Sequence, residues 1–183
     1  MARLEEIGPY EIPANVGYDI WQLSGMYTAA DRCTPATFNR LLHIEADGIE
    51  SFVAEHTKTY RQNHETESIT YVIDTDTSGV TLGKGEIRLS RTNDSDFYKN
   101  KPFVGQTTTT FEYRRQGLGL RRLHVMNMAS LAIHGLPLHS DTLRSRQAQS
   151  LWEKLVEQGV AQRYMQANPV TGKSCERYCF IQQ

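Results

Sequence analysis

The chain has 183 residues, of which 39% are hydrophobic and 22% charged, and its formal net charge is −1. This length and composition are typical of one globular domain and exclude a disordered chain. The charge gives no sign of a generally basic nucleic-acid-binding protein. No apolar run reaches the roughly 18 residues that cross a membrane, and the first residues lack the apolar core of a signal peptide. We therefore expect a cytoplasmic protein that has neither a nucleic-acid nor a membrane partner.

The cysteines and histidines show no metal-ligand spacing. Cys175 and Cys179 are four residues apart, and the sequence contains no Cys-x-x-Cys or His-x-x-x-His pair. Three cysteines make an odd number, and they do not form the pattern of a disulfide framework. We therefore expect no bound metal, and a reducing compartment.

The first 65 residues are the least regular part of the chain. Apolar residues at helical spacing predict a short amphipathic helix within residues 16–30, and Thr34-Pro35 is a candidate start for another. Residues 41–44 read as a short strand. Residues 47–61 read as a helix, because their apolar side chains recur near one face. We interpret residues 1–65 as a variable, helical N-terminal part and as the place where substrate specificity or a partner surface is decided.

A hairpin is predicted next. Residues 69–73 are β-branched and aromatic, and residues 80–89 form a second strand after a turn. Gly83 and Gly85 within the second strand allow a bulge or the close approach of another segment. Residues 91–101 form a polar loop.

The strongest functional signal is a threonine-rich strand followed by a glycine turn and a helix. Residues 107–111 favour a strand, and residues 120–134, which are rich in Leu, Met and Ala, favour a helix. Gly117 and Gly119 lie between them, where glycine permits positive φ and close approach of a ligand. Four arginines flank this turn: Arg114, Arg115, Arg121 and Arg122. Successive N–H groups at a helix start bind anions, so the pattern predicts a polyanionic ligand that contains a pyrophosphate.

The spacing of the turn decides between known pyrophosphate motifs. A dinucleotide fingerprint needs a third glycine where this chain has Arg122, and no Gly-Lys-Ser/Thr of a Walker loop is present. Arg114, Gly117 and Gly119 fit Arg-x-x-Gly-x-Gly. Together with the preceding Glu112-Tyr113, they resemble the coenzyme-A-binding motif of the GNAT N-acetyltransferase superfamily.

That resemblance implies how acetyl-coenzyme A would bind. The turn would hold its pyrophosphate and the preceding strand would pair with its pantetheine arm. The residues implied for binding are Thr110, Phe111, Glu112, Arg114, Arg115, Gln116, Gly117, Leu118, Gly119, Leu120 and Arg122. Arg121 and Arg122 also begin a helix, where cations are disfavoured, and this suggests an anionic partner such as the 3′-phosphate.

A second block, downstream, resembles the same family. After a short strand near residues 138–142, a predicted helix carries Ala148, Leu151 and Trp152, followed by Glu-Lys-Leu. Residues 162–167 and 174–181 then form a terminal hairpin. The resemblance covers about residues 69–181. It implies an α+β, three-layer GNAT-like fold with a mixed, mostly antiparallel sheet flanked by helices, in a single domain 1–183 with its acetyl-coenzyme-A-binding core at 66–183.

Acetyl transfer also requires a base for the amine and a proton donor for the departing thiolate. The base candidates are Glu86, Glu112 and His139, although a solvated carboxylate or a plain structural histidine is the simpler interpretation of each. The family's usual acid is a tyrosine at the position of Trp152 here, so Tyr164 or a water would have to replace it. Trp152 itself reads as a core residue or as a contact of the pantetheine arm.

The sequence therefore predicts an acetyl-coenzyme-A-dependent N-acetyltransferase that acts on an amine of a small molecule or a protein. The alternative is a catalytically inactive binding or inhibitory protein on the same fold, acting through protein–protein contacts. Acetyl-coenzyme A is the expected co-substrate, the acceptor or protein partner is undefined, and a homodimer is compatible with the sequence.

Overall fold

The computed structural model describes residues 2–24, 38–59, 66–90, 100–142, 144–168 and 171–182. The strands are β1 (Arg3–Glu6), β2 (Arg40–Ala46), β3 (Ile49–Thr59), β4 (Thr66–Asp76), β5 (Thr81–Ser90), β6 (Phe103–Thr109), β7 (Ala161–Ala167) and β8 (Ser174–Phe180). The helices are α1 (Ala14–Ser24), α2 (Leu118–His134) and α3 (Arg146–Glu157), together with the short 3-10 helices η1 (Pro9–Glu11) and η3 (Phe111–Tyr113).

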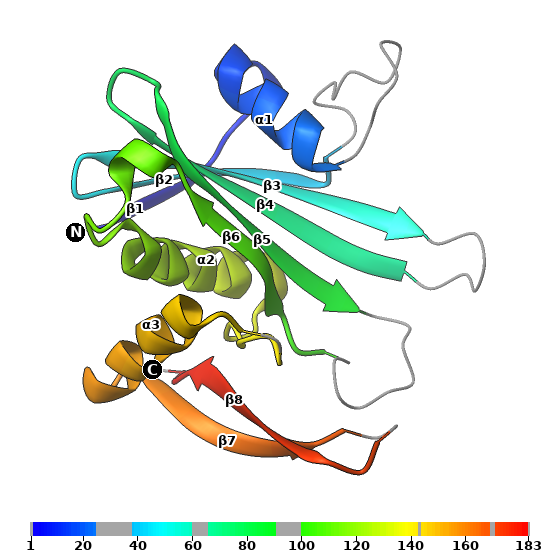
Figure 1. Ribbon diagram of the computed structural model, residues 1–183. Helices are drawn as coiled ribbons and strands as arrows, with labels where there is room; N and C mark the ends of the chain where they lie inside the picture. The colour runs from blue at the N-terminus through cyan, green and yellow to red at the C-terminus, as the bar shows by residue number, and fades with distance from the viewer. Residues whose placement is uncertain are drawn as a thin grey trace.

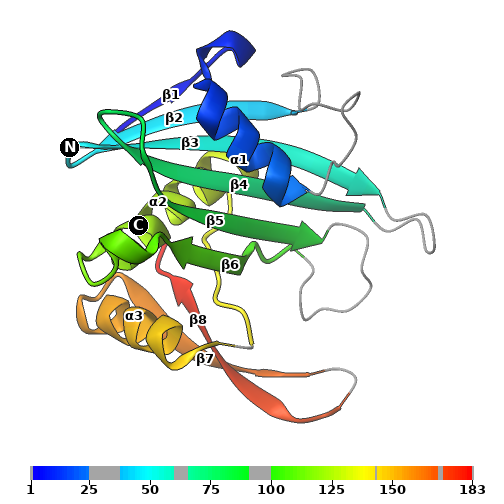
Figure 2. The same cartoon turned by 45° about the horizontal axis from the view of Figure 1, so that its top comes forward.

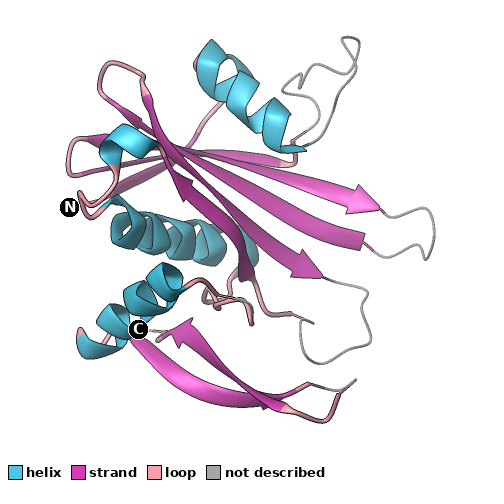
Figure 3. Ribbon diagram, in the orientation of Figure 1, coloured by secondary structure: helices cyan, strands magenta, loops and turns pink. Residues whose placement is uncertain are grey.

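Strands β1 to β6 form one antiparallel sheet in sequence order, and β7 and β8 form a separate hairpin. Helix α1 covers one face of the sheet, which we call the α1 face. Helix α2 covers the opposite face, the α2 face, and α3 lies beside α2 next to the hairpin (Figures 1 and 2). The layers of helix and strand are also clear in Figure 3. The predicted α+β class, a mostly antiparallel sheet flanked by helices, is confirmed.

Both faces of the sheet are buried, so the chain has two cores. On the α2 face, Val72 and Ile87 pack with Met126 of α2, and this cluster continues to Trp152 and Tyr178 beneath α3. On the α1 face, Val16 and Ile20 of α1 belong to a cluster with side chains of β2, β3 and β4: Leu41, Phe52, Ala54, Ile69, Tyr71 and Ile73. Burial of apolar surface contributes about 25 cal/mol per Å², so these two clusters hold the helices on the sheet.

The sheet and the hairpin meet through a short segment, Leu138, His139 and Ser140, which we call the joint. His139 pairs in parallel with Phe103 of β6 and antiparallel with Cys179 of β8. Its N–H donates to the Pro102 carbonyl (2.7 Å) and its own carbonyl accepts from Val104 N–H (3.0 Å). The strand predicted near residues 138–142 is thus reduced to this joint, which holds the first residues of β6 but leaves the last residues of β6 free.

One predicted element is wrong: residues 47–61 are not a helix, because Ile49–Thr59 is strand β3. Asp47 (φ 56°) and Gly48 (φ 71°) both adopt left-handed backbone and pair Ala46 with Ile49 in a two-residue hairpin. An Asp-Gly turn between apolar runs is a hairpin signal. A central strand that is buried on both faces has apolar residues on both sides of its backbone. In β3 some of these residues are spaced as on one face of a helix, and this spacing led to the wrong prediction.

The N-terminal third is consequently not a helical appendage. Its strands β1, β2 and β3 form half of the six-stranded sheet, and its described α helix is α1. The strand predicted at 41–44 is confirmed within β2, and the helix predicted within 16–30 is confirmed as far as Ser24. Thr34-Pro35 and residues 91–99 lie outside the described residues.

The remaining elements agree with the sequence-based predictions. The β4–β5 hairpin, the helix at 120–134 and the terminal hairpin are confirmed. Gly83 does permit close approach of another segment: a Cβ there would lie 2.0 Å from Arg122 Nη2 and 2.5 Å from the Thr108 carbonyl oxygen. Gly85 lies in the same way against Met126 and Arg122 of α2.

We expect Gly83→Ala to lower the free energy of unfolding by at least about 2 kcal/mol, because the methyl group collides with backbone as well as side chain. Gly17→Ala is the matched control. Gly17 lies within α1, and a Cβ there would meet its nearest neighbour, Cγ2 of Ile12, at 3.9 Å. That variant should be neutral or stabilised by up to about 1 kcal/mol. Denaturant unfolding measures both, and equal effects at the two positions would contradict the packing described for Gly83.

Candidate functional site

The connection between β6 and α2 forms the predicted glycine turn. Strand β6 ends at Thr109, η3 follows, and α2 begins at Leu118 with Gly117 as its N-cap. Arg115 (φ 66°) and Gly117 (φ 80°) adopt left-handed backbone. The 3-10 helix was not predicted, because Phe111 read as the last residue of the strand.

The start of α2 presents unpaired backbone donors. The N–H groups of Leu120 and Arg121 bond the Gly117 carbonyl at 3.1 and 3.2 Å. Within the described part of the chain, the N–H groups of residues 116–119 have no hydrogen-bond partner. Such groups carry the positive end of the helix dipole, so this turn can bind an anion.

The two glycines of the turn serve different purposes. A Cβ on Gly117 would meet nothing within 4 Å, so glycine is favoured there by its positive φ alone. A Cβ on Gly119 would lie 3.0 Å from Cδ1 of Leu151, so glycine there lets α3 pack close to the first turn of α2. The second glycine therefore positions one wall of the site.

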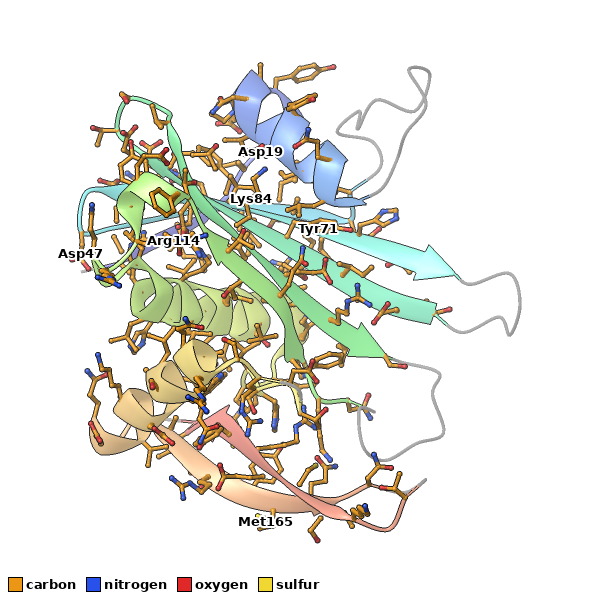
Figure 4. The ribbon with its side chains drawn as sticks, viewed as in Figure 1. Asp19, Asp47, Tyr71, Lys84, Arg114 and Met165 are labelled. Atoms are coloured by element: carbon orange, nitrogen blue, oxygen red, sulfur yellow. The ribbon has the colours of Figure 1, made fainter. Side chains whose placement is uncertain are left out.

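A groove of about 790 Å³ opens between the end of β6, this turn and α3. It is lined by Thr107, Thr108, Thr109, Tyr113, Arg114, Arg115, Gly117, Leu118, Gly119, Ser145, Gln147, Ala148, Leu151 and Lys154. Three lining residues are cationic, and no carboxylate is among the described residues that line it. Figure 4 shows Arg114 on the connection between β6 and α2. The groove therefore suits an elongated anionic ligand.

The wall formed by β6 is a free strand edge. Thr110 N–H donates to the Leu82 carbonyl of β5 (3.0 Å). Backbone direction alternates along a strand, so the N–H and C=O groups of Thr107 and Thr109 point away from β5, toward the groove side. Arg114 Nε reaches the Thr109 carbonyl from that side (3.4 Å). An extended ligand could pair with this edge as an added strand does.

A buried ion pair between α2 and β4 also holds the end of β6, which forms one wall of the groove. The guanidinium of Arg122 is fully buried, and its Nε donates to Asp74 Oδ2 of β4 (2.7 Å). Its Nη1 donates to the carbonyl of Thr108 (2.6 Å) and to Thr109 Oγ1 (3.2 Å), both on residues that line the groove. One side chain of α2 thus ties the end of β6 to the interior of the sheet.

Arg121 also bonds the Asp74 carboxylate, through its other oxygen. Its Nη1 lies 3.3 Å from Asp74 Oδ1 and 3.1 Å from Ser51 Oγ, and its Nη2 donates to the Ile49 carbonyl (2.9 Å). Burial lowers the pKa of Arg121, and the charge of Asp74 opposes that shift. The anionic partner of these two arginines at the helix start is therefore Asp74 of the same chain, and Arg122 does not line the groove.

Five of the residues implied for acetyl-coenzyme A binding line the groove: Arg114, Arg115, Gly117, Leu118 and Gly119. Others lie nearby but are not among its lining residues. Phe111 is 75% exposed, with the Arg114 guanidinium 5.2 Å from its ring centre, and the Thr110 hydroxyl bonds the Thr81 carbonyl. Gln116 is exposed, and Leu120 packs against the α2-face core.

The sequence-based site missed the contribution of α3. Gln147, Leu151 and Lys154 recur at helical spacing along one face of α3 and line the groove together with Ser145 and Ala148. The second resembling block contains most of these residues. Their helical period, taken with the neighbouring glycine turn, was the signal that could have identified them.

The three base candidates lie in three different places. Glu86 is 5% exposed on the α1 face and accepts a hydrogen bond from Arg88 Nε. Glu112 is exposed on η3, where its carbonyl accepts from Gln116 Nε2 (3.5 Å). His139 lies in the joint. The three candidates therefore lie on three separate segments: β5, η3 and the joint.

His139 is instead bonded to Tyr164 of β7. Its Nδ1 lies 2.8 Å from the phenol oxygen, and the two rings meet edge to face with centroids 5.7 Å apart. Burial, helped by the nearby charges of Arg177 and Lys101, lowers the pKa of His139 to about 4. Burial raises the pKa of Tyr164 to about 12. Both side chains are therefore neutral at pH 7.

Trp152 is a core residue. Its side chain is 2% exposed, stacked on Tyr178 (centroids 6.0 Å apart) and edge to face with Phe180 (5.5 Å). The core interpretation of Trp152 is confirmed, and the indole is not among the groove-lining residues.

Comparison with known proteins finds solved structures that align with this chain only weakly. No family model matches the chain, and no curated protein sequence matches it significantly. A candidate GnaT-family acetyltransferase from Bordetella pertussis aligns with a TM-score of 0.42 and 16% identity, over 62% of this chain and 66% of its own, just under two thirds. A candidate acyl-CoA N-acyltransferase from Klebsiella pneumoniae aligns with a TM-score of 0.44 and 14% identity over 99% of both chains.

A third structure, an IAA acetyltransferase from Bacillus cereus, aligns with a TM-score of 0.41 and 10% identity over 98% of this chain and 99% of its own. At these identities and TM-scores, the alignments assign no activity and no ligand to this chain.

Two further observations concern the described residues only. None of their helices is both long and apolar enough to span a bilayer. They also contain no group of three His, Cys, Asp or Glu side chains arranged to hold a metal ion.

The depressed pKa of His139 has a consequence for stability. Between its ordinary value of 6.5 and about 4, the unfolded chain binds a proton at this site that the folded chain does not. Stability should therefore fall as pH is lowered through this window. We expect denaturant unfolding of the wild type to show this loss and His139→Gln to show less of it. Identical pH dependence in both proteins would contradict the burial assigned to His139.

Proposed function

We propose that the protein is an acyl-coenzyme-A-dependent N-acyltransferase that transfers an acetyl group to an amine of a small molecule or a protein. The observation that carries this proposal is the groove, which joins unpaired amides at a helix start to the free edge of a strand. Few ligands combine a diphosphate with an extended arm that contains amides, and coenzyme A is one of them. The free thiols of Cys175 and Cys179 support a reducing, cytoplasmic location.

The residues of the groove fit such a ligand in three respects. Open space beside Gly117 gives a diphosphate access to the amides of residues 116–119. Arg115 and Lys154 would add charge without a competing carboxylate. The outward N–H and C=O groups of Thr107 and Thr109 would pair with amides of the extended arm. Bound there, acyl-coenzyme A would supply an activated thioester, and the chain would orient it.

Of the three base candidates, we propose Glu86. Gln106 of β6 is its cross-strand neighbour, and Gly105 forms a bulge beside them, so Glu86 lies on the α1 face near the place where β6 leaves the joint. A Cβ on Gly105 would lie 2.7 Å from Glu86 Oε1, so glycine there makes room for the carboxylate. Acting through a water, Glu86 would accept the proton of the attacking amine.

Two assays test the function. Calorimetry with coenzyme A measures binding, and release of free thiol from acetyl-coenzyme A over a panel of primary amines measures transfer. Binding with transfer is the expected result. Binding without thiol release would support the alternative, a catalytically inactive binding protein. Absence of binding would overturn both the transferase and the assignment of the groove.

Lys154→Gln should weaken coenzyme A binding about threefold to fivefold at low salt, because one exposed charge is lost from the groove. The difference should shrink at high salt, which screens exposed charges. Arg146→Gln is the matched control, since Arg146 is an exposed cation of the same helix that does not line the groove. Equal losses of affinity in the two variants, measured by calorimetry, would argue against a ligand in the groove.

A further inference from the structure

The register of the strands places His139 on the α1 face. Paired residues of adjacent strands direct their side chains to the same face. Phe103 pairs with Arg88 on one side and with His139 on the other, and His139 pairs in turn with Cys179. Lys84, four residues before Arg88 on β5, bonds Asp19 of α1, which identifies this face (Figure 4). His139 therefore lies on the same face as Glu86.

Past His139, the strand pairing between β6 and the segment that leads to residue 141 is interrupted, and we call this interruption the gap. On one side Glu86 pairs with Gln106, and β6 is the last strand of its sheet. On the other side, Asp141 follows His139 by two residues, and Arg177 pairs with Tyr164 of β7. Between β6 and residue 141 the described residues form no strand pairing. A ligand arm that continued from the groove along the free edge of β6 would end in this gap, beside the joint.

Tyr164 is held at the edge of this gap. Its phenol oxygen lies 2.8 Å from His139 Nδ1. Arg177, its strand partner, is fully buried, donates from Nε and Nη2 to the Ser140 carbonyl (3.0 and 2.8 Å), and bonds Gln166 through Nη1 (2.9 Å). Tyr164 and His139 are only partly buried. The phenol is thus both oriented and accessible.

Helix α3 offers no aromatic donor in place of Tyr164. Trp152 is enclosed by Tyr178 and Phe180 in the core. A thiolate that leaves a thioester is nevertheless stabilised by a hydrogen-bond donor, because negative charge gathers on sulfur.

We infer that Tyr164 is a catalytic residue that donates a hydrogen bond to the sulfur of the bound thioester, and that His139 is its positioning residue. This inference rests on the proposed function. In this arrangement His139 Nδ1 would carry the proton and donate to the phenol oxygen, which would leave the hydroxyl hydrogen available to the sulfur. No proton is transferred in this interaction.

The charges around the pair are consistent with that role. Burial, helped by the charges of Arg177 and Lys101, keeps His139 neutral, so the ring adds no charge beside the phenol. Burial keeps the phenol protonated at neutral pH, despite the opposing effect of Arg177. The donor is therefore available throughout the physiological pH range.

The test uses coenzyme A itself and needs no acceptor. The ultraviolet absorbance of its thiolate, followed against pH in the saturated complex, gives the pKa of the bound thiol. Removing the donor in Tyr164→Phe should lower the ratio of bound thiolate to thiol roughly tenfold at a fixed pH, while the affinity for coenzyme A changes little. Tyr178→Phe, which removes a buried phenol from the neighbouring strand, is the control and should leave the ratio unchanged.

A second pair of variants tests the role of His139. His139→Ala should lower the thiolate ratio by less than Tyr164→Phe does, and His139→Gln, which retains an N–H donor, should restore it. An unchanged thiol pKa in Tyr164→Phe, with coenzyme A still bound, would overturn this inference alone. Failure of the wild type to bind coenzyme A would overturn the proposed function and this inference with it.

Discussion

The groove depends on one buried carboxylate that holds two arginines. Asp74 is fully buried near the end of β4, and Arg121 and Arg122 reach it from the start of α2. Cations at the start of a helix interact unfavourably with the helix dipole. A nearby anion offsets this effect, and here that anion is the carboxylate of Asp74. Removing one partner of such a buried pair typically costs about 3–5 kcal/mol. Through Arg122, the same pair fixes the end of β6 relative to the start of α2.

The second constraint is the joint between the two sheets. His139 holds the beginning of β6 through two backbone hydrogen bonds, whereas on the side away from β5 no described strand pairs with Thr107 and Thr109. A strand edge in that state normally invites pairing with another chain. Here α3 and the glycine turn of α2 enclose it in a groove that admits one extended ligand. The amides of α2, the edge of β6 and the pair formed by His139 and Tyr164 then lie in sequence from one end of such a ligand to the other.

Local patterns in the sequence predicted much of this arrangement, and non-local contacts account for the rest. Gly117 and the helix after it were recognisable because capping and turn chemistry are local. Strand β3 was misread because burial on both faces removes the alternation that identifies a strand. Arg122 was interpreted as a ligand contact because its partner, Asp74, lies 48 residues away and only the folded sheet brings them together. The bond between His139 and Tyr164 likewise depends on pairing across two sheets.

The most direct test of the central claim is a nitrogen–proton correlation spectrum of the protein during titration with coenzyme A. We expect the largest shifts at the amides of residues 116–119, where the diphosphate would bind, and further shifts at Thr107 and Thr109 along the strand edge. Saturable shifts confined to another surface, with these amides unchanged, would contradict the account.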